Sequence, residues 1–256
     1  MFGAIAGDVI GSIYERHPIK SKEFKLFDAE CRFTDDTVLT IAVAHALLDG
    51  GDNYADKYRT YYRSYPTAGY GGAFRAWARS PDSRPYNSFG NGSAMRVSPV
   101  GFALNDLNRV RLEARRSAEV THNHPEGIKG AEATAAAVFL ARAAEAKNKI
   151  RAYLEQQFGY DLSRTPDEIR PGYAFDVTCQ GTVPAALCCF LYSDSYEDTV
   201  RNAVSLGGDS DTLACIAGSV AGAFWGTPAW IWTEAEKRLD DQLRAVIARF
   251  VARFGA

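Results

Sequence analysis

Hydrophobic residues recur along this chain mostly at helical spacing. In the stretch 37–50, Val38, Ile41 and Leu48 fall on one helical face, and the stretch closes on Asp-Gly-Gly, a common helix end. The same spacing predicts further helices, over 94–104, 105–122, 126–149, 182–193, 195–206, 212–226 and 233–254. Alternating strand patterns are almost absent, and only residues 172–178 are a weak strand candidate. The pattern therefore predicts an all-α fold.

No shift in composition and no linker divides the chain. The most loop-like stretch, 164–173, has no separate core signature on either side. At 256 residues the chain lies near the upper end of a single domain, and we expect one compact helical domain over residues 1–256.

The N-terminal stretch AIAGDVIGSIYE combines small residues with two acids. Gly7 and Gly11 are four residues apart, so they share a helical face and permit another helix to pack closely. Asp8 and Glu15 are seven apart and also share a face. Glu15 is either an exposed helix residue or a carboxylate that faces a functional site.

Charge, hydropathy and cysteine content argue against a nucleic-acid-binding, a membrane and a disulfide-stabilised protein. With 29 Lys and Arg against 31 Asp and Glu, the net charge is -2, so no basic field indicates a nucleic-acid partner. No run approaches the roughly 20 apolar residues of a membrane helix, and the N-terminus lacks a basic leader. Five cysteines at irregular spacing, with Cys188 and Cys189 adjacent in an apolar run, favour reduced, buried thiols in a cytoplasmic protein. A cysteine nucleophile stays open.

Two short acidic clusters carry the candidate chemistry, FTDDT at 33–37 and GGDSDT at 207–212. Each combines carboxylates with a threonine hydroxyl in a loop that leads into an apolar helix, and hard cations such as Mg²⁺ take such oxygen ligands. If the fold joins the clusters, four carboxylates converge, and their repulsion favours a bound cation. The candidate ligands are Thr34, Asp35, Asp36, Asp209, Asp211 and Thr212. The alternative is two independent helix starts capped by Asp36 and Asp209.

Two further stretches are candidates for substrate contact. The loop NSFGNGS at 87–93 leads into an apolar stretch, where backbone N–H groups and Arg96 could meet a phosphate and Phe89 could stack on a base or sugar. It lacks the lysine of an ATPase P-loop. In VTHNHPEGIKGA, His122 could hydrogen-bond a substrate, whereas His124 is expected to be an ordinary loop histidine. Their spacing does not match a zinc site.

Five pieces in this order resemble the ADP-ribosylglycohydrolase family. They are GAIAGDVIGSIYE, FTDDT, GNGSAMR, THNHPEGIKGA and GGDSDTLACIAGSVAGAFWG, which together run from residue 3 to about 226. The resemblance implies an all-α fold of orthogonal helices around a binuclear centre of two Mg²⁺ or Mn²⁺ ions.

The resemblance also implies residue roles. Thr34, Asp35 and Asp36 correspond to ligands of one ion, Asp209 and Thr212 to ligands of the other, and Asp211 to a carboxylate shared by both. Glu15 corresponds to a glutamate beside the metals, and with Asp36 it is the expected catalytic residue. The expected substrate-binding residues are Asn87, Ser88, Phe89, Asn91, Gly92, His122 and Gly208.

The implied activity is metal-dependent removal of ADP-ribose from a modified protein or a small ADP-ribosyl compound. An arginine linkage is slightly favoured, on the analogy of short bacterial members. The chain is short for the family, so loops that choose the acceptor could be trimmed. The alternatives are a non-catalytic binder of ADP-ribose or nucleotide, and a metal-dependent phosphohydrolase that cleaves the diphosphate.

Overall fold

A computed structural model describes residues 1–82 and 84–255, and the all-α class is confirmed: every regular element in this part is a helix. The described residues contain one isolated antiparallel bridge, between Gly90 and Thr178, and no strand. The weak strand expected at 172–178 therefore does not form. The helices follow the chain as α1 (Phe2–Gly11), α2 (Asp35–Leu48), α3 (Tyr54–Ser64), α4 (Gly72–Arg79), α5 (Gly92–Met95), α6 (Ser98–Ala103), α7 (Leu107–Glu119), α8 (Pro125–Arg142), α9 (Lys147–Phe158), α10 (Pro166–Ile169), α11 (Cys179–Leu191), α12 (Tyr196–Ser205), α13 (Ser210–Trp225), α14 (Ala229–Glu236) and α15 (Asp241–Phe254).

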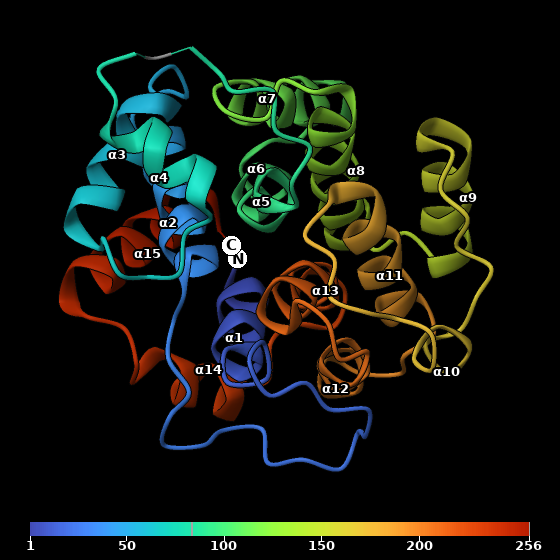
Figure 1. Cartoon of the computed structure of the whole chain (residues 1–256). Helices are drawn as coiled ribbons and strands as arrows, with labels where there is room; N and C mark the ends of the chain where they lie inside the picture. Colours follow the sequence, from blue (N-terminus) through green and yellow to red (C-terminus); the bar gives the residue numbers. More distant parts are fainter. Residues whose placement is uncertain (83, 256) are drawn as a thin grey trace.

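Helices α1 and α13 lie side by side at the centre of the molecule, with α2, α3 and α15 on one side and α8 and α11 on the other (Figure 1). The two central helices run antiparallel and touch through glycine. A Cβ atom built on Gly7 would lie 2.1 Å from the carbonyl oxygen of Ala214, and one on Gly11 would lie 2.6 Å from the Cα of Asp211. The close packing expected of these glycines is confirmed, and it brings α1 directly against the second acidic cluster.

The stretch 94–104 forms two short helices rather than one. Pro99 has no N–H to donate to the carbonyl of Met95 four residues earlier, which breaks the helical ladder. That carbonyl instead accepts from Cys215 Sγ at 3.3 Å and from Thr40 Oγ1 at 3.4 Å. The break therefore ties α5 to both α13 and α2.

The helix expected over 126–149 ends at Arg142. Ala144 adopts a left-handed φ of 59°, and its N–H donates to Ala141 O while that of Glu145 donates to Leu140 O. This pair of bonds is the Schellman helix end, here with alanine where glycine is usual. The helix expected over 233–254 is likewise divided, because Asp240 accepts from Leu243 N and starts α15 as its cap.

Sequence patterning missed α3, α4, α9 and α10. The buried face of α3 is built from tyrosines (Tyr54, Tyr58, Tyr61 and Tyr62), which a count of aliphatic positions overlooks. The short α10 lies in the loop-like stretch and is held by a capping box between Thr165 and Glu168. Among the described helices, none is both long and apolar enough to cross a membrane.

Candidate metal centre and active-site cavity

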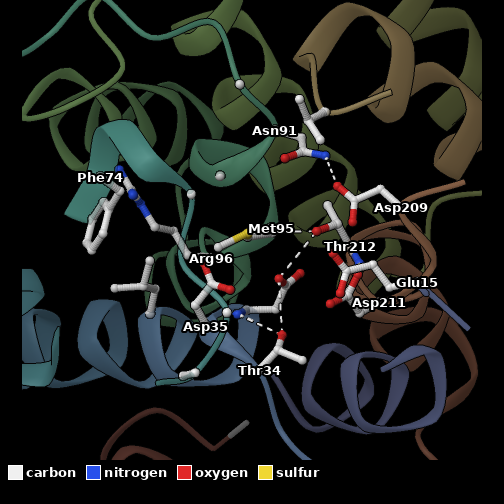
Figure 2. Close-up of a pocket in the computed structure, with 18 of the residues that line it drawn as sticks. Glu15, Thr34, Asp35, Phe74, Asn91, Met95, Arg96, Asp209, Asp211 and Thr212 are labelled. Atoms are coloured by element: carbon white, nitrogen blue, oxygen red, sulfur yellow. Dashed lines mark hydrogen bonds between the residues drawn. The ribbon is translucent and has the colours of Figure 1, made fainter. Parts of the chain in front are cut away.

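The two acidic clusters meet at the start of α2 and the start of α13. Carboxylate oxygens of Asp8, Asp36 and Asp211 lie within 4.8 Å of one another, and all three side chains are buried. Thr212 Oγ1 donates to Asp36 Oδ2 at 3.3 Å, which joins clusters 176 residues apart in the sequence. Figure 2 shows Thr34 and Asp35 on one side of the site and Asp209, Asp211 and Thr212 on the other.

Helix capping does not account for these acids. The N-cap of α2 is Thr34, whose hydroxyl accepts from Asp36 N at 3.3 Å, so Asp36 is not the cap. Asp209 occupies the N-cap position of α13, but its side chain accepts no capping hydrogen bond from that helix. It accepts instead from Asn91 Nδ2 at 2.7 Å. Neither Asp36 nor Asp209 therefore acts as the helix cap that the alternative reading required.

Asp8 is the residue of this group that sequence reasoning left without a role. From α1 it reaches the start of α2, where it accepts from the backbone N–H groups of Thr34 (3.0 Å) and Thr37 (3.1 Å) and from both hydroxyls. The Thr34 hydroxyl donates to Asp8 at 2.6 Å, which leaves its lone pairs for other partners. The one sequence signal was an acid set between two packing glycines of an apolar helix.

Burial and mutual repulsion make these carboxylates resist ionisation. Burial raises the pKa of Asp8 to about 6, even though four hydrogen bonds favour its charged form. The pKa values of Asp36 and Asp211 are raised well above the ordinary value, first by burial and then by the neighbouring carboxylates. Asp35, which is partly exposed, has a raised pKa for the same two reasons. No basic residue within 1–82 or 84–255 forms an ion pair with Asp8, Asp36 or Asp211.

The donor set fits a hard divalent cation. Carboxylate and hydroxyl oxygens are the ligands that Mg²⁺ and Mn²⁺ prefer, and the described part of the cluster contains no sulfur or imidazole ligand. Asp36 Oδ1 is buried without a hydrogen-bond partner, as expected for an atom whose partner is an ion. The buried aspartate triad is thus a candidate metal site.

A cavity of about 390 Å³ opens over the acidic cluster. This volume is within the range of small-molecule sites, roughly 300–1,000 Å³. Its lining includes acids of the two clusters, Asp35, Asp36, Asp209 and Asp211, the polar residues Asn91 and His122, and the aromatic residues Phe74, Tyr86 and Phe175. Of the expected site residues, those that line the cavity are Glu15, Thr34, Asp35, Asp36, Ser88, Asn91, Gly92, His122, Asp209, Asp211 and Thr212.

Glu15 lines the cavity from a different element than expected. Helix α1 ends at Gly11, so Glu15 lies in the following turn and does not share a helical face with Asp8. It is half-buried, and its pKa is raised by burial and next by the charge of Asp209, while Arg16 and Arg32 oppose that shift. Its carboxyl group is therefore at the edge of the acidic cluster.

Three expected substrate-binding residues lie outside the cavity wall: Asn87, Phe89 and Gly208. Asn87 adopts a left-handed φ of 54°, and its N–H donates to Asn123 Oδ1. The ring of Phe89 is 46 % exposed and lies 5.3 Å from that of His124. Gly208 packs on Tyr173, where a Cβ atom would lie 2.6 Å from the ring.

Two backbone N–H groups of the loop 87–93 already donate hydrogen bonds within the protein. Gly90 N donates to Ser88 Oγ at 3.1 Å, and Asn91 N donates to Val177 O at 2.8 Å. These two N–H groups are not free for a phosphate. His124, expected to be an ordinary loop histidine, is the N-cap of α8 and accepts from Glu126 N at 3.1 Å.

Arg96 lines the cavity, and its guanidinium is held by partners on other helices. Its side chain is fully buried, and its guanidinium lies 4.1 Å from the ring centre of Tyr58. Nη2 donates to Ser117 O at 3.2 Å and to Thr121 Oγ1 at 2.8 Å, while Nε and Nη1 are buried without partners.

The five cysteines are free and buried, as the sequence predicted. No cysteine is among the described residues that line the cavity. Burial raises the pKa of Cys179 and of Cys188 to about 12, which suppresses the thiolate. The open possibility of a cysteine nucleophile therefore finds no support.

This chain is similar to two known ADP-ribosyl hydrolases. The chain is 28 % identical to the ADP-ribosylhydrolase ARH3 of Mus musculus, over 88 % of this chain and 82 % of that protein. It is 25 % identical to the ADP-ribosylarginine hydrolase Tri1 of Pseudomonas putida, over 95 % of this chain and 76 % of that protein. The aligned region with ARH3 spans 305 positions, more than this chain's 256 residues, so the relative carries insertions that this chain lacks.

A solved structure described as an ADP-ribosylglycohydrolase-related protein complex shares the fold. Its TM-score is 0.75 at 24 % identity, and the match covers 98 % of this chain and 95 % of that one. A sequence profile described as ADP-ribosylglycohydrolase matches residues 1–255. The chain therefore belongs to the ADP-ribosylglycohydrolase family.

Proposed function

We propose that this chain hydrolyses the glycosidic bond between the ribose of an ADP-ribosyl group and its acceptor, with two Mg²⁺ or Mn²⁺ ions at the acidic cluster. The observation that carries the proposal is the meeting of FTDDT and GGDSDT beneath one cavity, with Asp36 Oδ1 left without a partner. Membership of the family supports the choice of an ADP-ribosyl substrate.

The proposed ligands of one ion are Thr34, Asp35 and Asp36, those of the other are Asp209 and Thr212, and Asp211 is shared. Bound cations of this kind hold sugar hydroxyls and lower the pKa of a coordinated water. The chain contributes the fixed positions of these oxygens, since Asp8 anchors Thr34 and Asn91 anchors Asp209.

Proton transfer is assigned to carboxyl groups at the same place. Cleavage at an anomeric carbon needs one group that takes a proton from water and one that gives a proton to the leaving group. Glu15 is half-buried beside Asp209, and its raised pKa favours a carboxyl group that can both hold and release a proton. Asp36, with its unpartnered Oδ1, is the second carboxylate proposed for catalysis.

The acceptor side chain is the least constrained part of the proposal. Arginine is favoured slightly, and the similarity to a protein named ADP-ribosylarginine hydrolase supports it. Arg16 and Arg32, which line the cavity on the side of Glu15, oppose it because they would repel a guanidinium. Serine- and carboxylate-linked substrates therefore belong in the same assay.

The test is release of ADP-ribose from arginine-, serine- and carboxylate-linked ADP-ribosyl proteins incubated in parallel with Mg²⁺. We expect intact ADP-ribose from at least one substrate, loss of release on chelation, and loss of release in Asp211→Ala. Unchanged turnover in Asp211→Ala would remove the role given to that residue. Release of AMP would identify a phosphohydrolase, and binding without turnover would identify a non-catalytic relative.

A further inference from the structure

We infer that Arg96 and Thr121 are positioning residues that fix the proton of the His122 ring on Nε2, so that this N–H donates into the cavity to an acceptor oxygen of the bound substrate. The inference rests on the proposed function only for the identity of that substrate. The position of the proton follows from the hydrogen bonds around the ring.

The two ring nitrogens of His122 face different surroundings. Nδ1 lies 2.7 Å from Thr121 Oγ1, whereas Nε2 has no hydrogen bond to any residue within 1–82 or 84–255. His122 lines the cavity, and a Cβ atom on Gly92 or Gly90 would lie 3.2 or 3.7 Å from Nε2. The glycines of the loop therefore leave the space in front of Nε2 open.

The hydroxyl of Thr121 decides which nitrogen carries the proton. It accepts from Arg96 Nη2 at 2.8 Å, and a guanidinium cannot accept in return. The single hydroxyl hydrogen then has two acceptors, Ala118 O at 3.5 Å and His122 Nδ1 at 2.7 Å. If Nδ1 accepts, the hydroxyl hydrogen makes a hydrogen bond of 2.7 Å; if Nδ1 carries the proton, that hydrogen is left with the long contact to Ala118 O at 3.5 Å, and Oγ1 accepts from both Arg96 and Nδ1. The first arrangement is the stronger, so Nδ1 accepts and the proton of a neutral ring is on Nε2.

The surroundings keep the ring neutral. His122 is only 4 % exposed, and its pKa is lowered well below the ordinary value by burial and next by the charge of Arg96. A charged ring would need Nδ1 to donate to the second lone pair of Thr121 Oγ1, and the hydroxyl hydrogen would then be left with the long contact to Ala118 O at 3.5 Å. Arg96 thus favours both the neutral form of the ring and the donation of the Thr121 hydroxyl to Nδ1.

Arg96 is hard to explain as packing alone. It is fully buried in the cavity wall, and no carboxylate in the described part of the chain forms an ion pair with it. A buried cation without a counter-ion is costly, and a neutral side chain could fill the space beside Tyr58. The one side chain among the described residues to which Arg96 donates a hydrogen bond is that of Thr121. A charged donor polarises that hydroxyl and strengthens its own donation to His122.

A fixed Nε2–H donor favours a substrate oxygen that accepts a hydrogen bond. The ADP-ribosyl group offers such oxygens on its diphosphate and its riboses. A ring free to exchange tautomers would present an acceptor part of the time, and would then oppose these oxygens. The proposed advantage is therefore in substrate binding, with no part in bond cleavage.

The direct test is long-range ¹H–¹⁵N NMR of the ring nitrogens in the metal-free protein, with His122 assigned by comparison with His122→Gln. We expect the Nε2–H form in the wild-type protein and a mixture of tautomers in Thr121→Val. Thr121→Ser should restore the wild-type spectrum, and Thr134→Val is the matched control because its buried hydroxyl has no partner. An Nδ1–H ring in the wild type would overturn the inference.

The functional readout is the binding of ADP-ribose by calorimetry. We expect Thr121→Val and Arg96→Met to weaken binding about tenfold, the loss of roughly one hydrogen bond, with wild-type affinity in Thr121→Ser and Thr134→Val. Equal affinity in Thr121→Val despite a changed tautomer would remove the role in binding. If wild-type protein releases no ADP-ribose, the proposed function fails, while the NMR spectrum still decides the position of the proton.

Discussion

The contact between α1 and α13 offers a test of how the metal cluster is positioned. A Cβ atom on Gly11 would lie 2.5 Å from Ser210 O, 2.6 Å from Asp211 Cα and 2.7 Å from Asp211 N. All three are backbone atoms, so no rotamer change relieves the clash. Restoring van der Waals contact requires the helices to separate by about 1 Å at this point. Gly11→Ala therefore displaces the backbone of a proposed metal ligand.

The expected cost has a structural and a functional part. Overpacking of this kind costs about 1–3 kcal/mol, and at about 2–4 °C per kcal/mol for a chain of this size the Tm falls by about 2–12 °C. A shift of about 1 Å in the catalytic geometry lowers turnover by about 10²-fold. The Tm rise caused by Mg²⁺ or Mn²⁺ should shrink in parallel, because Asp211 no longer aligns with Asp36.

The assay is thermal unfolding with and without Mn²⁺, followed by ADP-ribose release. Gly172→Ala is the matched control, since a Cβ atom there meets nothing within 4 Å, and it should stay within about 0.5 kcal/mol of wild type. Wild-type Tm, cation response and turnover in Gly11→Ala would refute the reasoning. So would an equal loss in Gly172→Ala.

Three further predictions concern the acids. Asp211→Asn removes the free-energy cost of ionising or protonating a buried carboxyl group among like charges. The free energy of unfolding of the metal-free protein should therefore rise by about 1–2 kcal/mol in a denaturation assay, and the cation-induced rise in Tm should be lost in a thermal-shift assay. Asp8→Ala should have the opposite effect. The free energy of unfolding should fall by at least about 3 kcal/mol in the same denaturation assay, because four buried donors lose their acceptor. The raised pKa values of Asp8 (about 6), Asp36 and Asp211 mean that the metal-free folded state binds protons that the unfolded state has released. Its free energy of unfolding therefore falls as pH rises above the ordinary aspartate pKa, and the Tm rise caused by Mg²⁺ should be larger at about pH 7.5 than at about pH 5; a rise that is equal or smaller at the higher pH contradicts this account.

Local sequence signals predicted what depends on local physics. Regular apolar spacing located α2, α12 and α13, and the four-residue spacing of Gly7 and Gly11 predicted the close contact of α1 with another helix. The two acidic clusters were visible because two acids and a hydroxyl in so few residues exceed what a helix cap needs. Their meeting in space could be expected only from the family resemblance.

Features that depend on tertiary partners were out of reach. Pro99 causes the break before α6. The break is stable because Cys215 and Thr40 donate hydrogen bonds to the carbonyl of Met95 that Pro99 leaves without a partner. The contact of the Arg96 guanidinium with the ring of Tyr58 was not foreseen, because Tyr58 lies on a tyrosine-lined helix that the patterning missed. The role of Asp8 as an acceptor for Thr34 and Thr37 depends on the contact between α1 and the start of α2, which no local pattern predicts.

The proposed hydrolysis has one decisive measurement. Wild-type protein and Asp211→Ala are incubated with ADP-ribosylated protein and Mn²⁺, and the released nucleotides are identified by mass spectrometry. We predict intact ADP-ribose from the wild type, none after chelation, and none above background from Asp211→Ala. Release of AMP by the wild type, or equal release of ADP-ribose by Asp211→Ala, would contradict glycosidic hydrolysis at this cluster.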